Sequence, residues 1–108
     1  MATALFRKQI KPAAATLADL YTVAEGTKAV SSSIIACNTS GTATTFRIAH
    51  RLLGASISDV HYLYKDLPIG ANDTFKVTGG ITFIAEDVLS VYSASGAVTF
   101  QVYGQENT

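Results

Sequence analysis

Val, Ile and Thr supply 29 of the 108 residues, and turn-forming residues interrupt them at regular intervals along the chain. Branching at Cβ favours the pleated, half-buried environment of a strand. Short strands separated by turn signals about every 8 to 12 residues are typical of an all-β sandwich or barrel. The sequence therefore predicts an all-β fold.

The apolar runs between turn signals place the strands. We expect them over residues 16–23, 28–38, 42–51, 60–67, 74–78, 81–84, 88–94 and 98–103, with residues 52–58 as a loop or a short helical turn around Gly54. A short helix that opens at residues 13–15 is an alternative for the first of them, but elsewhere the Thr, Val and Ile density and the frequent Gly argue against a helical period. The prediction is a single-domain, jelly-roll-like β-sandwich of about seven to eight antiparallel strands.

The first residues differ in character from the rest. Residues 1–12 carry Arg7, Lys8 and Lys11 ahead of Pro12, so we expect a basic N-terminal arm followed by a β-sandwich domain over residues 13–108. The arm is either a solvated tail or a segment that docks on an acidic surface of a neighbouring subunit. Its removal before Pro12 is expected to weaken assembly and to leave the fold intact.

Composition excludes several classes of partner. Eight basic residues balance eight acidic ones, which argues against a nucleic-acid binder, because such proteins neutralise phosphates with a clustered basic face. A single cysteine cannot form an intramolecular disulfide. We expect no membrane span, because no apolar run approaches the roughly 18 residues that one needs, and no secretory signal, because the basic start lacks an apolar segment.

The chain has few groups for metal or nucleophilic chemistry. A zinc site built from Cys37, His50 and His61 is conceivable, but their spacing matches no metal motif, so we interpret them as packed or edge residues. No Gly-x-Ser-x-Gly elbow is present, and Cys37 has no flanking protease signature, which argues against a hydrolase.

The carboxylates and the Gly-rich turns favour no enzyme class either. Paired carboxylates could hydrolyse a glycoside, but the acidic residues fall at predicted strand ends, where they are common turn formers: Asp59, Asp66, Asp73, Glu86 and Asp87. Phosphate-binding and dinucleotide-binding glycine patterns are missing. We therefore expect no enzymatic activity, no cofactor and no metal.

Aromatic residues suggest a binding surface. Strand alternation would place Tyr62 and Tyr64 on one face, where they could stack on a sugar together with Tyr92 and Tyr103. Tyrosines serve a core or a subunit interface equally well, because they bury a large area and keep a polar group, and we favour that interpretation.

The outward strand faces are short of charge. Only 15% of the residues are charged, and Thr45, Thr82, Ser90 and Thr99 are predicted to point outward from their strands without edge-protecting lysines. Uncharged faces of this kind are often covered by neighbouring subunits. The chain is therefore expected to work inside an assembly, as a homo-oligomer or with other proteins.

Several segments resemble small proteins encoded by tailed bacteriophages. The resemblance extends from about residue 12 to residue 104 and is carried by residues 15–23, 26–30, 37–39, 43–49, 61–64, 67–75 and 87–92. These segments are strand and turn patterns and contain no catalytic signature. One departure is Ala24-Glu25-Gly26, where similar chains often have Pro-Ala-Gly, which affects only the rigidity of that turn.

The resemblance implies a virion structural protein with a β-sandwich or jelly-roll fold and no catalytic residues. Proteins of this kind include capsid decoration (cement) proteins, head fibres, and neck, tail or baseplate components. We favour capsid decoration through contacts with major capsid or tail proteins, and Arg7, Lys8, Lys11, Tyr62 and Tyr64 are the candidate partner-binding residues. A receptor-binding or carbohydrate-binding tip module is the alternative.

Overall fold

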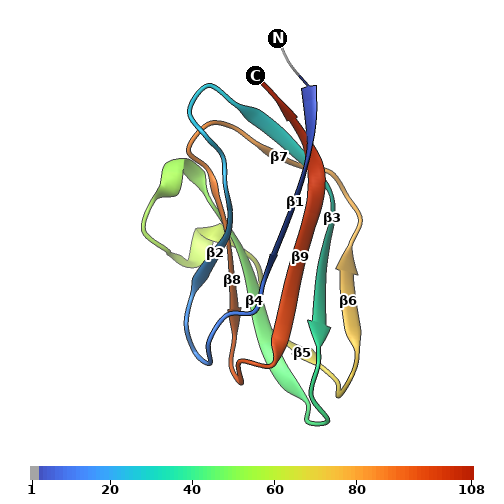
Figure 1. The fold of residues 1–108 in the computed structure, drawn as a ribbon. Helices are drawn as coiled ribbons and strands as arrows, with labels where there is room; N and C mark the ends of the chain where they lie inside the picture. Colours follow the sequence, from blue (N-terminus) through green and yellow to red (C-terminus); the bar gives the residue numbers. More distant parts are fainter. Residues whose placement is uncertain (1–2) are drawn as a thin grey trace.

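The computed structural model describes residues 3–108, which form nine strands and two short 3₁₀ helices (Figure 1). In chain order these are β1 (Thr3–Ile10), β2 (Ala18–Thr22), β3 (Lys28–Asn38), β4 (Thr44–Arg51), η1 (Leu52–Gly54), η2 (Asp59–His61), β5 (Tyr62–Ile69), β6 (Thr74–Val77), β7 (Ile81–Phe83), β8 (Val88–Ser93) and β9 (Val98–Asn107). None of the helices in residues 3–108 has the length and apolar character needed to cross a membrane.

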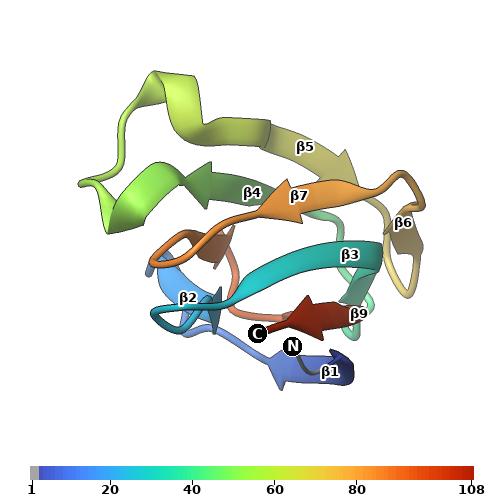
Figure 2. The ribbon, with the colours of Figure 1, turned by 90° about the horizontal axis from the view of Figure 1, so that it is seen from above.

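The strands form two antiparallel sheets that pack face to face (Figures 1 and 2). One sheet has the order β1-β9-β3-β6, and the other has the order β2-β8-β4-β5. β7 also pairs with β3, so β6 and β7 occupy successive stretches of one edge of that strand. Strands from the two ends of the chain alternate in both sheets, which is the order of a jelly roll. The predicted all-β, jelly-roll-like sandwich is confirmed.

The core lies between the sheets. Phe46, Phe83 and Phe100 are its largest fully buried side chains, and the rings of Phe46 and Phe100 are in edge contact, with 6.0 Å between centroids. Residues 98–102 of β9 alternate buried apolar side chains with partly exposed polar ones. This is the period of two that the sequence analysis used to place the strands.

Register shifts move several side chains to faces that simple alternation does not predict. β2 shifts against β8 between Asp19 and Tyr21, so Leu20 and Tyr21 are both buried, although alternation places them on opposite faces. β3 shifts against β9 between Ser31 and Ser33. Val30 therefore points outward and is 40% exposed, although simple alternation would place it on the same face as the buried Ile34. Leu63 in β5 is also exposed, at 41%.

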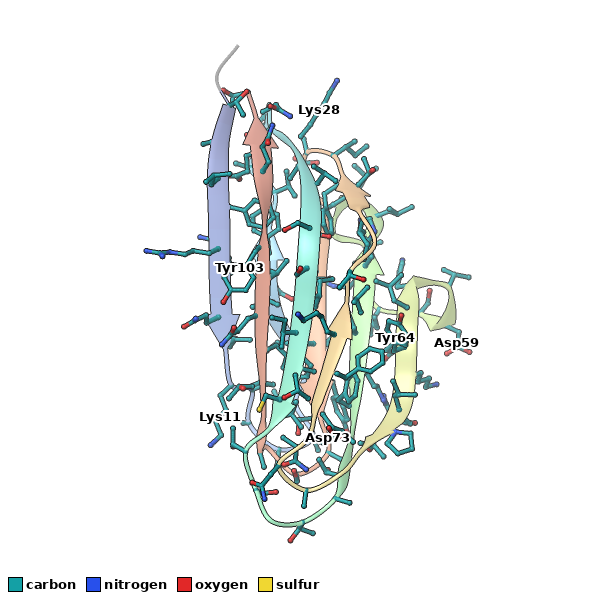
Figure 3. The ribbon with its side chains drawn as sticks, turned by 90° about the vertical axis from the view of Figure 1, so that its right-hand side faces the viewer. Lys11, Lys28, Asp59, Tyr64, Asp73 and Tyr103 are labelled. Carbon is teal, nitrogen blue, oxygen red and sulfur yellow. The ribbon has the colours of Figure 1, made fainter. Side chains whose placement is uncertain are left out.

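The predicted N-terminal arm is wrong as a description of residues 3–10. These residues form β1, which pairs with β9 through eight consecutive partners, from Thr3 opposite Asn107 to Ile10 opposite Phe100. Figure 3 shows β1 lying alongside β9 at the margin of the sheet. The sandwich therefore includes the segment that the sequence analysis placed outside it, because β9 extends to residue 107 and offers it a partner.

An aromatic contact attaches β1 to the second sheet. The ring of Phe6 stacks on that of Tyr21 in β2, with 4.2 Å between centroids. The Tyr21 hydroxyl donates a hydrogen bond of 2.6 Å to Glu106 Oε2 in β9. Burial, followed by this contact with Glu106, raises the pKa of Tyr21 well above its usual value, so the phenol stays neutral and remains a donor. Phe6 thus anchors β1 to both sheets.

Gly104 lies where three strands approach one another, opposite Phe6 in β1 and Ser31 in β3. A Cβ at this position would clash with the carbonyl oxygen of Val30 and would lie 2.6 Å from Cε1 of Phe6. We expect Gly104→Ala to lower the free energy of unfolding by about 3 kcal/mol, because the backbone must move to admit the methyl group. Urea denaturation measures the change. Gly79→Ala is the control, since a Cβ there has open space around it, and equal losses in the two variants would contradict the expectation.

Candidate interaction surface

The segment between β4 and β5 is the most exposed apolar part of the described chain. Figures 1 and 2 show it standing out from the two sheets. Leu52, Leu53 and Val60 are 58%, 63% and 88% exposed. The other large exposed apolar residues nearby are Ile57, Leu63 and, from the β7–β8 turn, Ile84. We call the side chains of Leu52, Leu53, Ile57, Val60, Leu63 and Ile84 the apolar surface.

Part of the apolar surface borders a groove. Leu53 and Ile84 line it together with Ala85, and its charged lining residues are Glu25, Glu86 and Lys28. Three separate turns of the chain therefore meet at this end of the sandwich, where apolar and charged side chains line one groove.

A buried carboxylate holds two of these turns together. Asp87 is 1% exposed, and its Oδ1 accepts a hydrogen bond of 2.9 Å from the backbone N–H of Leu53. Its Oδ2 accepts from the N–H of Ile84 at 3.1 Å and lies 2.8 Å from Nε2 of His50. Because a carboxylate oxygen only accepts, the imidazole Nε2 is the donor. One side chain thus fixes the position of two residues of the apolar surface.

These hydrogen bonds also determine the protonation of Asp87. Burial raises the pKa of the carboxyl, but the N–H of Leu53, the imidazole of His50 and the N–H of Ile84 outweigh it, so the pKa lies below its usual value. Asp87 is therefore ionised at neutral pH. Its negative charge is compensated by hydrogen bonds from Leu53, Ile84 and His50, all within the fold. We therefore interpret Asp87 and His50 as a structural pair.

Arg51 fixes the next part of the segment. Its Nη1 donates to the backbone carbonyls of Gly54 at 3.3 Å and Ala55 at 2.9 Å. On the other side, its Nε donates to Ser90 Oγ at 3.0 Å and its Nη2 to Asp19 Oδ1 at 2.9 Å. The guanidinium therefore ties the start of the protruding segment to β2 and β8. It also covers Ser90, which was predicted to point outward from its strand and is completely buried.

A local hydrogen-bonded turn fixes the far part of the segment. The N–H of His61 donates to the Ser58 carbonyl at 3.1 Å, and the N–H of Ser58 donates to His61 Nδ1 at 3.0 Å. The second of these bonds, from the Ser58 N–H to the His61 side chain, is one half of a capping box at the start of η2. The apolar surface is consequently displayed on a segment with hydrogen-bonded supports at both ends.

The three basic candidate residues lie along one edge of the fold. Arg7 and Lys8 are exposed on β1, and Lys11 is exposed just beyond it. None of the three takes part in an ion pair within residues 3–108, in contrast to Arg47, Arg51 and Lys65. The structure thus places them along the margin of one sheet, and no carboxylate among the described residues neutralises their charges.

The two tyrosine candidates have different surroundings. Tyr64 packs edge-on against Phe75 beside the core, with 5.0 Å between ring centroids. Tyr62 lies next to cations, with Lys65 Nζ 5.3 Å and Arg47 Cζ 5.8 Å from its ring centre. Register shifts between β4 and β5 occur in this stretch and explain the departure from simple alternation. The rings of Tyr62 and Tyr64 therefore have different neighbours, and that of Tyr64 packs beside the core.

The groups considered for metal binding are dispersed. His50 is paired with Asp87 and contacts the ring of Phe83, with 4.6 Å between centroids. His61 belongs to the capping box, and Cys37 is half-buried in β3, opposite Thr99 of β9. The interpretation of His50 as a packed residue agrees with these contacts.

The sequence analysis did not select Leu52, Leu53, Ile57 or Val60. For Leu52, Leu53 and Ile57, apolar character in a predicted loop was the available signal. Val60 was assigned to the predicted strand over residues 60–67 and lies in η2 instead. Asp87 was interpreted as a turn former. Its role as a buried anchor could not be predicted from the local sequence, because two of its partners lie 34 and 37 residues away.

The comparisons with known proteins give a likeness at the level of the fold. No family model and no curated protein matches the sequence. The structure is similar to a chain in the acidic stable capsid structure of Helicobacter pylori bacteriophage KHP30, with a TM-score of 0.57 and 9% sequence identity. The likeness covers 98% of this chain and 87% of that one, so the two chains are similar in length and share the whole sandwich.

Proposed function

We propose that the protein is a non-enzymatic structural subunit of a tailed-phage virion, and specifically a capsid decoration protein that binds neighbouring virion proteins. The observation that carries the proposal is the apolar surface. Exposed large apolar side chains gathered in one part of a protein mark sites of association, and four of the six here lie within residues 52–60.

The supports of the apolar surface favour a docking role. Asp87, Arg51 and the Ser58–His61 capping box hold the protruding segment before any partner arrives. A preorganised surface loses less conformational entropy on binding than a flexible loop does. The polar and ionisable residues here therefore position apolar side chains for a partner.

The fold likeness supports the virion assignment. The similar chain comes from a phage capsid structure and is only slightly longer than this one. A sandwich of this size adds to a shell most simply as an accessory subunit. The alternative within the same class is a neck, tail or baseplate component, which would use the same apolar surface in a different part of the particle.

The number of copies per particle separates these roles. Quantitative mass spectrometry of purified particles should find the protein at a copy number comparable with that of the major capsid protein, because a decoration protein repeats over the shell. A few copies to a few dozen would indicate the neck, tail or baseplate. Absence from the particles would contradict the virion proposal itself.

Substitution of the apolar surface tests its role directly. We expect the double variant Leu53→Asp and Val60→Asp to lose at least about tenfold in affinity for particles that lack the protein, because two charges would have to be desolvated at the contact. Its free energy of unfolding should change by no more than about 0.5 kcal/mol, since both side chains are exposed. Co-sedimentation with particles measures the binding.

The control for that experiment is Thr78→Asp. Thr78 is exposed in the turn between β6 and β7, away from the apolar surface. It adds a carboxylate without touching the proposed contact, and binding should stay at the wild-type level. An unchanged affinity of the double variant would exclude the apolar surface as the contact.

A further inference from the structure

The outer edge of β1 is a long strand edge without a partner in the described chain. β1 pairs with β9 on one side only, and within residues 3–108 no strand lies against its other side (Figure 3). In an antiparallel strand every second residue directs its N–H and C=O away from its neighbour. An eight-residue strand thus presents a row of free donors and acceptors, which is a template for another extended chain.

The charge beside this edge is positive and uncompensated. Arg7, Lys8 and Lys11 are exposed and have no ion pair among the described residues. The nearest carboxylate in register, Glu106 opposite Ala4, accepts the Tyr21 hydroxyl at 2.6 Å. Because successive side chains of a strand project from opposite faces, Arg7 and Lys8 place a cation on each face of β1.

An apolar groove runs next to the same edge. It is lined on the outer face of the sheet by Leu5 and Arg7 of β1, Val30 and Ser32 of β3, and Tyr103 and Gln105 of β9. Leu5 is 85% exposed at its margin. The edge therefore offers three kinds of contact together: backbone hydrogen bonds, a cation on each face, and an apolar site.

We propose that the free edge of β1 binds an extended acidic segment of another protein by strand addition. The segment carries carboxylates at two consecutive positions, opposite Arg7 and Lys8, and an apolar residue near Leu5. Opposite charges directly across a strand pair stabilise it, and like charges destabilise it. A second copy of β1 is a poor partner for this reason, because antiparallel self-pairing centred on Arg7 and Lys8 would bring four cations together. The inference needs only the structure of this edge and is independent of the role in a virion.

A synthetic peptide tests the proposal on the full-length protein. The probe is Thr-Val-Thr-Glu-Glu-Thr-Val-Thr, whose palindromic sequence allows parallel or antiparallel pairing, and the control is the same peptide with Lys-Lys at its centre. We expect the acidic peptide to bind at least about tenfold more tightly, with an affinity that falls as salt is added. In amide exchange followed by NMR, it should protect every second amide of β1. Equal binding of the two peptides, or β1 amides that exchange as before, would overturn the proposal.

Charge-reversal variants locate the contact. Arg7→Glu with Lys8→Glu should weaken binding of the acidic peptide at least about tenfold and restore binding of the Lys-Lys peptide. Lys28→Glu with Lys76→Glu is the matched control, since it reverses two exposed cations of the same sheet on β3 and β6, and it should leave β1 protection unchanged. Equal effects of the two double variants would show a general charge effect and overturn the proposal.

Two further measurements address other occupants of the edge. Single-stranded DNA that protected the same β1 amides more strongly than the acidic peptide would replace the proposal with nucleic-acid binding. A sedimentation mass of a dimer, with β1 amides already protected in the protein alone, would show that a second copy fills the edge. We expect neither result.

Discussion

Deletion of residues 1–11 is expected to lower the free energy of unfolding by more than about 4 kcal/mol, which is close to the whole stability of a small domain. The deletion removes all eight pairings of β1 with β9 and takes Phe6 from its stack on Tyr21. It also exposes to solvent the edge of β9 and the apolar core side chains that Phe6 covers. Urea denaturation and the amide exchange of β9 measure the loss, and Phe6→Ala alone should account for about 3 kcal/mol of it.

A charge-neutralised variant separates the strand from its charges. Arg7→Ser with Lys8→Ser keeps β1 and removes two exposed cations, so its stability should stay within about 0.5 kcal/mol of the wild type. If the deleted protein unfolded at the same urea concentration as the intact one, residues 1–11 would be an arm after all. The fold would then consist of residues 13–108, as composition suggested.

The difference between arm and strand shows what sequence patterns can predict. The strands from β2 to β9 can be predicted from β-branched residues, alternation and flanking turns, and each expected range overlaps an observed strand. β1 lacks that pattern, because only Phe6 along its length is buried and cations occupy its centre. Its structure comes from pairing with β9, nearly one hundred residues later, and local preferences contain no information about that contact.

Register shifts set a second limit. The exposure of Val30 and the joint burial of Leu20 and Tyr21 follow from an extra residue in β3 and in β2. A single inserted residue reverses the faces of all residues after it, and nothing in the amino-acid pattern marks the position. A register shift also falls between Tyr62 and Tyr64, whose rings have different neighbours in the structure.

The apolar surface illustrates the limit for function. Residues 52–58 were correctly expected to form a loop or a short helical turn, but whether their apolar side chains point inward or outward depends on what supports the segment. Those supports come from other elements: Asp87 from the β7–β8 turn and Arg51 with its partners on β2 and β8. Exposed apolar residues become a candidate site only when these long-range contacts are known.

Asp87→Ala is expected to lower the free energy of unfolding by about 4 kcal/mol. The substitution leaves the N–H groups of Leu53 and Ile84 without their acceptor, and His50 loses its partner in a mostly buried position. Removing one member of a buried, hydrogen-bonded charged group costs several kcal/mol, because the remaining groups stay desolvated. Amide exchange should show the greatest loss of protection at Leu53 and Ile84, and binding through the apolar surface should fall with it.

Asp59→Ala is the matched control for that loss. The side chain of Asp59 is 92% exposed, and its contact with Lys65 Nζ is 3.4 Å long. Exposed ion pairs of this kind contribute little, so the variant should lie within about 0.5 kcal/mol of the wild type. If Asp87→Ala lowered the free energy of unfolding by as little as Asp59→Ala, Arg51 and the Ser58–His61 capping box would be sufficient to hold the protruding segment.

The pH dependence of stability tests the charge of Asp87 separately from its shape. Because the pKa of Asp87 is lower in the folded protein than its usual value near 3.9, the unfolded chain takes up the proton first as the pH falls. The stabilisation from Asp87 is therefore fully present above about pH 5 and is lost as the pH falls below about 4, through the folded pKa. In Asp87→Asn, which keeps the shape and removes the titration, the decline in stability below pH 4 should be shallower than in the wild type. Parallel curves for the two proteins would mean that Asp87 binds its three partners without a net preference for the ionised form.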